Sequence, residues 1–262
     1  MEHLHTICNT IIKAEREAAE LILHAHGILA ETKSGRRDVV TEYDCRVQAL
    51  LMQRLSEAVP EAHYFCEEMD ERDRLDAEQL FIIDPIDGTM NFVHGFHHSC
   101  ISVAYAERGE VLAGVIYNPY VDELFTAVKG CGAFLNGKPI RVTDEGLAGS
   151  VACYGTAPYN PELTDQTFET ARKLYAVSLD LRREGSAALD LCTVAAGRAG
   201  LYFELKVSLW DYAAGDLIVR EAGGVCSQID GSPFPADGSR TSIAAGSPKA
   251  MAEFLELMNH NH

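Results

Sequence analysis

Asp84 and Asp87 stand three residues apart, directly after the apolar residues 81–83. An apolar run of this kind is typical of a buried strand, and α/β proteins place ligand sites at the carboxyl ends of such strands. Pro85 and Gly88 favour a turn here, so both carboxylates can point into one cleft and share a hard cation, for which oxygen donors are the natural ligands. The alternative is a strand-closing turn in which Asp and Gly only satisfy backbone groups.

Further carboxylates follow apolar residues elsewhere in the chain. Glu67 and Glu68 come directly after the apolar residues 65–66, and Asp211 follows the only tryptophan, Trp210. Taken alone, Asp211 fits the N-cap of a helix, because Asp accepts hydrogen bonds from the first free amides. We expect Trp210 to pack in the core and to hold Asp211 in place. Several acids in comparable settings favour a shared cation site over isolated turns.

Five segments of the chain resemble the signature elements of the inositol monophosphatase family, in the same order and at similar spacing. The resemblance extends from about residue 5 to residue 250. Cys66 and Met69 replace the Gly and Ser that flank the family's pair of glutamates. The five segments are residues 38–44 (DVVTEYD), 66–69 (CEEM), 84–92 (DPIDGTMNF), 129–137 (KGCGAFLNG) and 210–224 (WDYAAGDLIVREAGG).

The resemblance implies a set of magnesium ligands, with two or three Mg²⁺ ions in each active site. Glu67, Asp84 and the backbone carbonyl of Ile86 would hold the first ion. Asp84, Asp87 and Asp211 would hold the second, and Glu67 would also serve a third, weaker site. Bound cations would make an acidic cleft locally positive, which suits an anionic substrate.

The resemblance also implies a catalytic pair. Thr89 follows Gly88 at the expected start of a short helix, where backbone amides can hold phosphate oxygens. Thr89 would orient the attacking water, and Asp44 would accept the threonine proton beside Glu67. Taken alone, Thr41 and Asp44 fit a capping box at the start of a helix, and the two roles of Asp44 do not exclude each other.

Substrate contacts are implied in the same way, at Gly88, Thr89, Ala187, Glu204 and Asp211. Lys33 matches a family lysine near the metal ions, with a solvated loop lysine as the alternative. Arg183, with Arg182 before it, matches a basic pair, with an ion pair or a subunit contact as the alternative. Glu184 places an acid where many relatives have a neutral residue. Residues 154–160 align poorly with the family, which leaves the identity of the polyol open.

These assignments imply a phosphomonoesterase that hydrolyses inositol monophosphate or a similar small polyol or sugar phosphate with a metal-activated water. Fructose 1,6-bisphosphate and 3′-phosphoadenosine 5′-phosphate are alternative substrates, although residues 162–183 contain no obvious basic or aromatic clamp for a nucleotide. A non-catalytic regulatory protein that keeps the fold is a further alternative. The resemblance also implies inhibition by millimolar lithium and a homodimer.

The chain carries 39 acidic and 22 basic residues, a formal net charge of −17. This excess argues against a general nucleic-acid or anionic membrane surface, which requires clustered Lys and Arg. No apolar run approaches the roughly 18 to 20 residues that span a bilayer. Eight cysteines are scattered singly, which indicates free thiols, and we expect a cytoplasmic protein. His94, His97 and His98 have no carboxylate or further histidine at helical ligand spacing outside their own cluster, so we do not expect them to bind a metal ion.

In the first half of the chain, apolar residues recur at spacings of three and four from residue 4 to 28, which predicts a long amphipathic helix. We expect a polar loop over 31–37 and a second helix from Thr41 to the region of Pro60. Asn136-Gly137 is a strong hairpin signal. The predicted strands are residues 81–83, 101–106, 111–117 and 124–128.

From about residue 146, strands and helices alternate more regularly. The predicted strands are residues 151–154, 179–182, 201–205, 225–229 and 242–245, and the predicted helices are 165–175, 186–196, 211–222 and 248–258. We therefore predict a layered α/β sandwich of the order α-β-α-β-α. An N-terminal α+β half with an antiparallel sheet (1–145) would pack against a C-terminal α/β half (146–262), with the metal cleft between them.

Overall fold

The computed structural model describes residues 1–35, 38–69 and 74–259; for residues 33–35, 38 and 39 it describes the backbone alone. The chain begins with α1 (Glu2–Leu23), the strand pair β1 (Ala30–Gly35) and β2 (Asp38–Thr41), and α2 (Glu42–Ala58). A seven-stranded sheet follows, with the short helix α3 (Thr89–Val93) after its second strand. Its strands are β3 (His63–Cys66), β4 (Leu80–Asp87), β5 (Cys100–Glu107), β6 (Glu110–Asn118), β7 (Glu123–Val128), β8 (Ala133–Leu135) and β9 (Lys138–Ile140).

The rest of the chain forms a five-stranded sheet and four α-helices. Two short 3-10 helices, η1 (Leu147–Gly149) and η2 (Pro161–Leu163), precede β10 and α4. The strands are β10 (Val151–Tyr154), β11 (Asp180–Arg182), β12 (Leu201–Val207), β13 (Val225–Ser227) and β14 (Thr241–Gly246). The helices are α4 (Thr164–Val177), α5 (Ala187–Ala195), α6 (Leu209–Glu221) and α7 (Pro248–Asn259).

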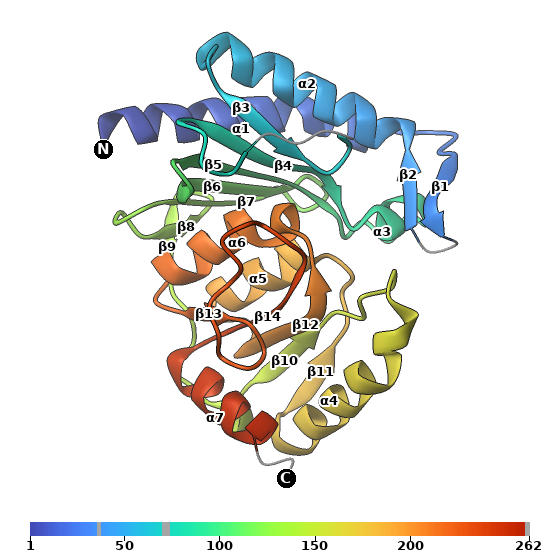
Figure 1. Cartoon of the computed structure of the whole chain (residues 1–262), viewed down its shortest axis with the longest axis vertical. Helices are drawn as coiled ribbons and strands as arrows, with labels where there is room; N and C mark the ends of the chain where they lie inside the picture. Colours follow the sequence, from blue (N-terminus) through green and yellow to red (C-terminus); the bar gives the residue numbers. More distant parts are fainter. Residues whose placement is uncertain (36–37, 70–73, 260–262) are drawn as a thin grey trace.

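The elements stack in five layers, which confirms the predicted α-β-α-β-α order (Figure 1). α1 and α2 cover one face of the seven-stranded sheet, and their apolar residues join that face in one core. α5 and α6 lie between the two sheets and form a second core with both of them. α4 and α7 close the outer face of the five-stranded sheet over a third core. The structure therefore buries each sheet on both faces.

The two sheets differ in strand direction. In the first sheet the order is β3-β4-β5-β6-β7-β8-β9, and all neighbours pair antiparallel except β3 and β4. In the second sheet the order is β11-β10-β12-β14-β13, with β10 parallel to both neighbours and β14 antiparallel to both of its own. The predicted division at residue 145 falls between the last strand of the first sheet and the first strand of the second. Because α5 and α6 pack against both sheets, the division into two halves stays a prediction.

Three expectations from the sequence were wrong in detail. Residues 31–35 belong to β1, which pairs antiparallel with β2, rather than to a loop; residues 36 and 37 of that predicted loop lie outside the described residues. A short polar strand carries no apolar alternation, so its backbone pairing leaves no signal in the sequence. The first helix ends at Leu23, and the strand predicted to stop before Asp84 continues to Asp87.

Helix α6 lies unusually close to the first sheet at Gly114 of β6. A Cβ atom on Gly114 would lie 2.9 Å from the carbonyl oxygen of Ala214, inside the range that real side chains avoid. Glycine at this strand position therefore lets the helix backbone rest directly on the sheet. This close approach fixes the distance between α6 and the first sheet. It thereby also fixes the position of Asp211 in the first turn of that helix.

The described helices contain none that is both long and apolar enough to cross a membrane. All eight cysteines are free thiols, as their scattered positions in the sequence predicted, and six of them are buried. These six are Cys8, Cys66, Cys100, Cys153, Cys192 and Cys226.

Glu15 lies on the face of α1 that packs against the sheet, beside the core positions Ile11, Ala18 and Ile22. Its side chain is fully buried, and neither carboxylate oxygen has a hydrogen-bond partner in the described structure. Burial raises the pKa of Glu15 well above its usual value, because the charged form loses its hydration. The folded protein therefore binds a proton here that the unfolded chain releases at a lower pH.

We predict that Glu15 lowers stability as the pH rises. A carboxyl whose pKa is raised in the folded state lowers the free energy of unfolding as the pH rises above its pKa in the unfolded chain, which is about 4.3. The decrease approaches about 1.4 kcal/mol per pH unit and continues until the pH reaches the folded-state pKa. Urea unfolding from pH 5 to 8 should therefore show Glu15→Gln gaining stability over wild type as the pH rises. The exposed Glu61→Gln should track wild type. Parallel pH profiles for Glu15→Gln and wild type would contradict the assignment.

Candidate active site

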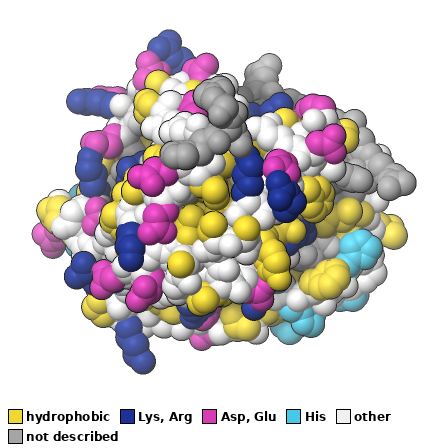
Figure 2. All heavy atoms as spheres, turned by 90° about the horizontal axis from the view of Figure 1, so that it is seen from below, with side chains coloured by type: hydrophobic (Ala, Val, Ile, Leu, Met, Phe, Trp, Pro, Cys, Tyr) yellow, Lys and Arg dark blue, Asp and Glu magenta, His cyan; other side chains and the backbone are white. Residues whose placement is uncertain are grey.

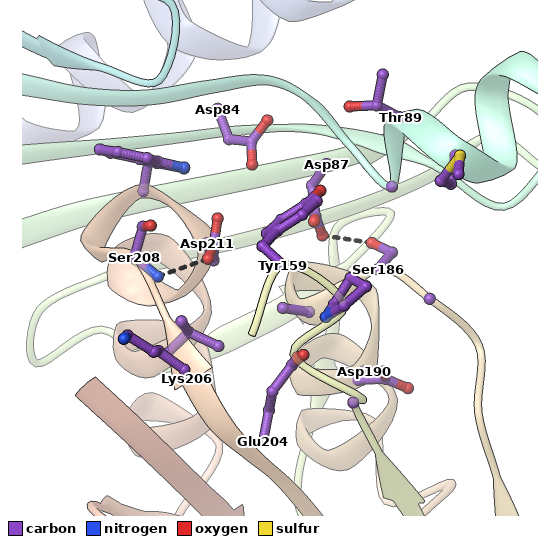
Figure 3. Close-up of a pocket in the computed structure, with 18 of the residues that line it drawn as sticks. Asp84, Asp87, Thr89, Tyr159, Ser186, Asp190, Glu204, Lys206, Ser208 and Asp211 are labelled. Atoms are coloured by element: carbon purple, nitrogen blue, oxygen red, sulfur yellow. Dashed lines mark hydrogen bonds between the residues drawn. The ribbon is translucent and has the colours of Figure 1, made fainter. Parts of the chain in front are cut away.

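A cleft of about 510 Å³ lies where the first sheet, α5, α6 and β12 meet. Figure 3 shows Asp84, Asp87 and Asp211 pointing toward a common space, with Glu204 and Lys206 further along the same cleft. Asp44 lies behind Thr89 rather than on the wall, and the side chain of Lys33 lies outside the described residues. The predicted site residues that line the cleft are Glu67, Asp84, Ile86, Asp87, Gly88, Thr89, Arg183, Ala187, Glu204 and Asp211.

A β-bulge puts Asp84 and Asp87 on the same side of β4. Asp84 pairs with Ser102 of β5 and Asp87 with Cys100, so β4 contains one more residue than its partner over this stretch. In a regular strand, side chains three positions apart point to opposite faces. The extra residue reverses the alternation, and Ile86 accordingly packs in the α1 and α2 core while both aspartates face the cleft.

Asp87 is held at the N-terminus of α5. Its Oδ2 atom accepts hydrogen bonds from the hydroxyl of Ser186 and from the backbone N–H of Ala188, at 2.7 Å for the latter. The free amides of a helix N-terminus favour a negative charge. Burial raises the pKa of Asp87 to about 6, against the lowering effect of the Ser186 and Ala188 hydrogen bonds.

Asp211 is held by its own helix. The N-cap of α6 is Ser208, so the alternative interpretation of Asp211 as the N-cap is wrong. Asp211 stands three residues later, and its Oδ2 accepts the backbone N–H of Ser208 at 2.6 Å, as in a capping box. Trp210 is buried and packs against Phe65 with ring centroids 5.9 Å apart, which confirms its predicted core position. Burial raises the pKa of Asp211, and the charges of Asp87 and Glu67 raise it further.

The three aspartates share one arrangement: one carboxylate oxygen is anchored and the other is open to the cleft. Asp84 Oδ1 accepts the backbone N–H of Ile86 at 3.1 Å, and the anchored atoms of Asp87 and Asp211 are the Oδ2 oxygens. The second oxygen of each has no hydrogen-bond partner within the described residues and is not among their buried unpartnered atoms. Each aspartate therefore presents one fixed oxygen donor to the same space.

This donor set fits a hard divalent cation. Burial raises the pKa of Asp84 well above its usual value, and the charges of Glu67, Asp87, Asp211 and Asp44 raise it further. Carboxylates that raise one another's pKa in a buried cleft are stabilised by a cation between them. The described Asp, Glu, His and Cys side chains form no group of three or more already gathered around one point. The assignment of individual ligands therefore stays a prediction.

Thr89 and Asp44 lie together, and the structure contains the capping box considered for Asp44, while its catalytic role stays a prediction. Thr89 Oγ1 lies within hydrogen-bonding distance of Asp44 Oδ1 (3.3 Å) and of the Ile86 carbonyl oxygen (3.1 Å). Asp44 Oδ2 accepts the backbone N–H of Thr41 at 2.8 Å, which completes the capping box of α2. The capping box thus fixes one oxygen of Asp44 and directs the other at Thr89.

Glu204 closes the far end of the cleft. Its Oε1 accepts the backbone N–H of Ala157 at 2.6 Å, and its Oε2 accepts the hydroxyl of Tyr202 at 2.7 Å. A Cβ atom on Gly155 would lie 1.9 Å from Oε2, so glycine is required there for the carboxylate to approach the backbone. Arg183 donates to Thr156 Oγ1 at 3.1 Å.

The segment that aligned poorly with the family forms part of the cleft wall. Gly155, Pro158, Tyr159 and Asn160 line it, and Figure 3 shows the ring of Tyr159 over the space between Asp87 and Glu204. The three histidines at 94, 97 and 98 do not line the cleft as the structure describes it.

Sequence reasoning missed Ser186 as a partner of Asp87, and it also missed the polar cleft residues Asp190, Lys206, Ser208 and Arg240. Lys206 stands two residues after Glu204 in β12, and the period of two in a strand would have placed both on one face. Arg240 follows a long loop, so only the folded chain brings it to the cleft.

Comparison with known proteins identifies the family. The model of the inositol monophosphatase family matches residues 3–261. The Nus factor SuhB of Pasteurella multocida (strain Pm70) is 37% identical over 257 residues, which cover 96% of this chain and 95% of that protein. The extragenic suppressor protein suhB from Bartonella henselae has a crystal structure that matches with a TM-score of 0.91 at 34% identity, covering 98% of this chain and 100% of that chain. The chain belongs to the inositol monophosphatase family.

A further solved structure bears on the site. An IMPase/NADP phosphatase complexed with Mg²⁺ and phosphate matches with a TM-score of 0.84 at 26% identity, covering 98% of this chain and 95% of that chain. Family membership confirms the resemblance and the layered α/β fold, and it supports a phosphatase and metal binding at the level of the family. The relatives carry both phosphatase and Nus factor names, so family membership alone does not establish the activity of this chain.

We predict that Gly88→Ala destabilises the protein more than Gly223→Ala. Both glycines have a φ of 87°, where a Cβ atom costs roughly 1 to 2 kcal/mol. At Gly223 a Cβ atom meets nothing within 4 Å, whereas at Gly88 it would lie 3.1 Å from the His98 carbonyl oxygen and 3.3 Å from Ser186 Cβ. This crowding should cost Gly88→Ala roughly 1 to 3 kcal/mol more in urea unfolding. Equal losses for the two variants would show that α3 and α5 are not in close contact.

Proposed function

We propose that the protein is a Mg²⁺-dependent phosphomonoesterase that acts on a small phosphorylated polyol or sugar. One observation carries the proposal: Asp84, Asp87 and Asp211 each present one anchored and one open oxygen to a single cleft. Glu67 and the carbonyl of Ile86 complete the proposed ligand set for two or three ions. When bound, Mg²⁺ would offset the carboxylate charges and stabilise negative charge on the phosphoryl and leaving oxygens.

The chain's own residues would position the water and the phosphate. Thr89 Oγ1, held near Asp44 Oδ1 and the Ile86 carbonyl, can accept a hydrogen bond from the attacking water while its own proton is directed at one of those oxygens. Asp44 would accept the threonine proton, and Glu67 on the cleft wall would assist in taking the proton of the water. Backbone amides at Gly88 and Thr89 would hold phosphate oxygens. The reaction forms one P–O bond to the water oxygen and breaks the ester P–O bond, and the leaving oxygen takes up a proton from solvent to depart as the alcohol.

The polyol would lie against Glu204, Asp211 and the N-terminal residue of α5, Ala187. Both oxygens of Glu204 already accept one hydrogen bond each, and each carboxylate oxygen can accept a second one from a substrate hydroxyl. Inositol monophosphate is the leading substrate, and fructose 1,6-bisphosphate and 3′-phosphoadenosine 5′-phosphate are the alternatives. A homodimer in the cytoplasm and contributions from Lys33 and Arg183 remain part of the proposal.

The names of the relatives favour a second candidate, a non-catalytic factor. Proteins that match nearly the whole chain are called Nus factor SuhB. On the face shown in Figure 2, acidic and basic side chains of the described residues are interspersed, without a continuous basic patch. The net charge of −17 and the described residues of this one face offer no continuous basic surface for a nucleic acid, whereas the Nus factor names of the relatives count against the expectation of no nucleic-acid partner. The complete carboxylate set in the cleft favours catalysis over this second candidate.

We predict phosphate release that requires Mg²⁺ and Asp87. Wild type should release phosphate from at least one of inositol 1-phosphate, fructose 1,6-bisphosphate and 3′-phosphoadenosine 5′-phosphate, and EDTA should abolish the reaction. Asp87→Asn should lose roughly 100-fold or more in kcat/KM, because one charged donor of the site is removed. The exposed Asp144→Asn should retain activity. Turnover that ignores both EDTA and the Asp87→Asn change would contradict the mechanism, and no turnover on any ester would favour the non-catalytic factor.

Inhibition by millimolar lithium is expected for the inositol phosphatase assignment. The same assay with LiCl and with an equal concentration of NaCl separates lithium inhibition from a general salt effect. Activity that is indifferent to lithium would count against inositol monophosphate as the substrate while leaving the metal requirement standing.

A further inference from the structure

Most described arginines are paired with a carboxylate, as expected in a chain with a net charge of −17. The paired arginines are Arg16, Arg46, Arg54, Arg74, Arg108, Arg172, Arg182, Arg198 and Arg220. Among the described residues, Arg141, Arg183 and Arg240 have no carboxylate within ion-pairing distance. Arg183 and Arg240 both line the cleft. The cleft therefore holds two arginines that form no ion pair with a described carboxylate.

Lys206 joins Arg240 at one end of the cleft. Both residues line the main cleft and also a second cavity of about 410 Å³ beside it, so they stand where the two hollows meet. Figure 3 shows Lys206 on the same side of the cleft as Ser208 and Asp211. Lys206 forms no ion pair or hydrogen bond to another described side chain. Arg183 differs from these two, because its charge faces Glu204 and lowers the pKa of that carboxyl against the effect of burial.

Arg240 is fixed to the turn that carries a proposed metal ligand. Its Nε donates to Ser208 Oγ at 3.1 Å, and the backbone N–H of Ser208 donates to Asp211 Oδ2. This chain of contacts places the guanidinium near the carboxylate cluster while leaving its terminal N–H groups unpaired within the described part of the chain. An arginine with free terminal N–H groups and a neighbouring lysine form a typical receptor for a phosphoryl group.

We propose that Lys206 and Arg240 bind a second phosphoryl group of the substrate. The proposal rests on the phosphatase function above and narrows its substrate class to small esters that carry two phosphoryl groups. One group would lie at the carboxylate cluster to be cleaved, and the other would lie at the junction of the two cavities. Residues 162–183 contain no basic clamp, but this does not argue against such substrates. The basic side chains come instead from Lys206 in β12 and from Arg240, the residue before β14.

The test compares matched esters with one and two phosphoryl groups. Fructose 1-phosphate is set against fructose 1,6-bisphosphate, and adenosine 3′-phosphate against adenosine 3′,5′-bisphosphate, with Mg²⁺ present. Wild type should prefer the bisphosphate of at least one pair. The double variant Lys206→Gln/Arg240→Gln should lose that preference by about 10-fold to 100-fold in kcat/KM, mainly through KM, since charge-assisted hydrogen bonds to one ligand group are removed. The ratio of kcat/KM for the bisphosphate to kcat/KM for the monophosphate is the readout, because loss of the contact between Arg240 and Ser208 would change the activity on both esters alike.

Arg141→Gln is the matched control, because Arg141 is exposed, unpaired among the described residues and outside the cleft. Arg141→Gln should leave kcat/KM unchanged for both esters of each pair. Lys206→Arg should keep the wild-type preference for the bisphosphate. A double variant that loses activity equally on monophosphate and bisphosphate, or keeps the wild-type preference, would overturn the proposal.

Calorimetric binding of the same esters in EDTA, which removes the Mg²⁺ that the proposed hydrolysis requires, separates this proposal from the phosphatase proposal. If no ester is hydrolysed with Mg²⁺ but the bisphosphate binds wild type more tightly than the double variant, the phosphatase proposal fails and the second phosphoryl site stands. If the monophosphate and bisphosphate bind alike to wild type and to the double variant, the second site is refuted whatever the enzyme assay shows.

Discussion

The carboxylate of Asp87 at the N-terminus of α5 is the contact on which the site depends. Asp87 ends a strand of the first sheet, and the Ser186 hydroxyl and Ala188 amide that bind it belong to the C-terminal half of the chain. Gly88 lets this approach happen, because a side chain there would press on the loop before α5. The cleft therefore forms only when α5 is packed under the first sheet, and folding of the core and assembly of the site are one event.

The same arrangement explains how buried acids can face each other in one cleft. Each of the three aspartates is fixed by a hydrogen bond to one oxygen, so its second oxygen is held in place while the surrounding carboxylates raise its pKa. Such mutual repulsion lowers the stability of the protein without a cation and raises its affinity for one. Functional sites commonly break the rules of a stable core in this way. Glu15 is also a buried carboxyl, but it lies on α1 and does not line the cleft.

Much of the fold was predictable from the sequence, because long apolar periodicities and turn signals mark most helices and strands. Most residues predicted for the site do line the cleft, but the sequence did not reveal how the backbone brings them together. A strict alternation in β4 would put Asp84 and Asp87 on opposite faces, and only the bulge against β5 brings them together. Lys206 and Arg240 are far apart in sequence and meet through the fold of the second sheet, and the polar strand β1 has no apolar pattern to reveal it.

The open oxygens of Asp84, Asp87 and Asp211 should hold divalent cations in the loaded protein. Crystals soaked in Mn²⁺, which shares the oxygen preference of Mg²⁺, test it through anomalous diffraction. We expect two or three anomalous peaks in the cleft, at coordination distance from those oxygens, with the opposite oxygens still bound to Ile86, Ala188 and Ser208. An absence of peaks in the cleft, or peaks only at other surface acids, would contradict it.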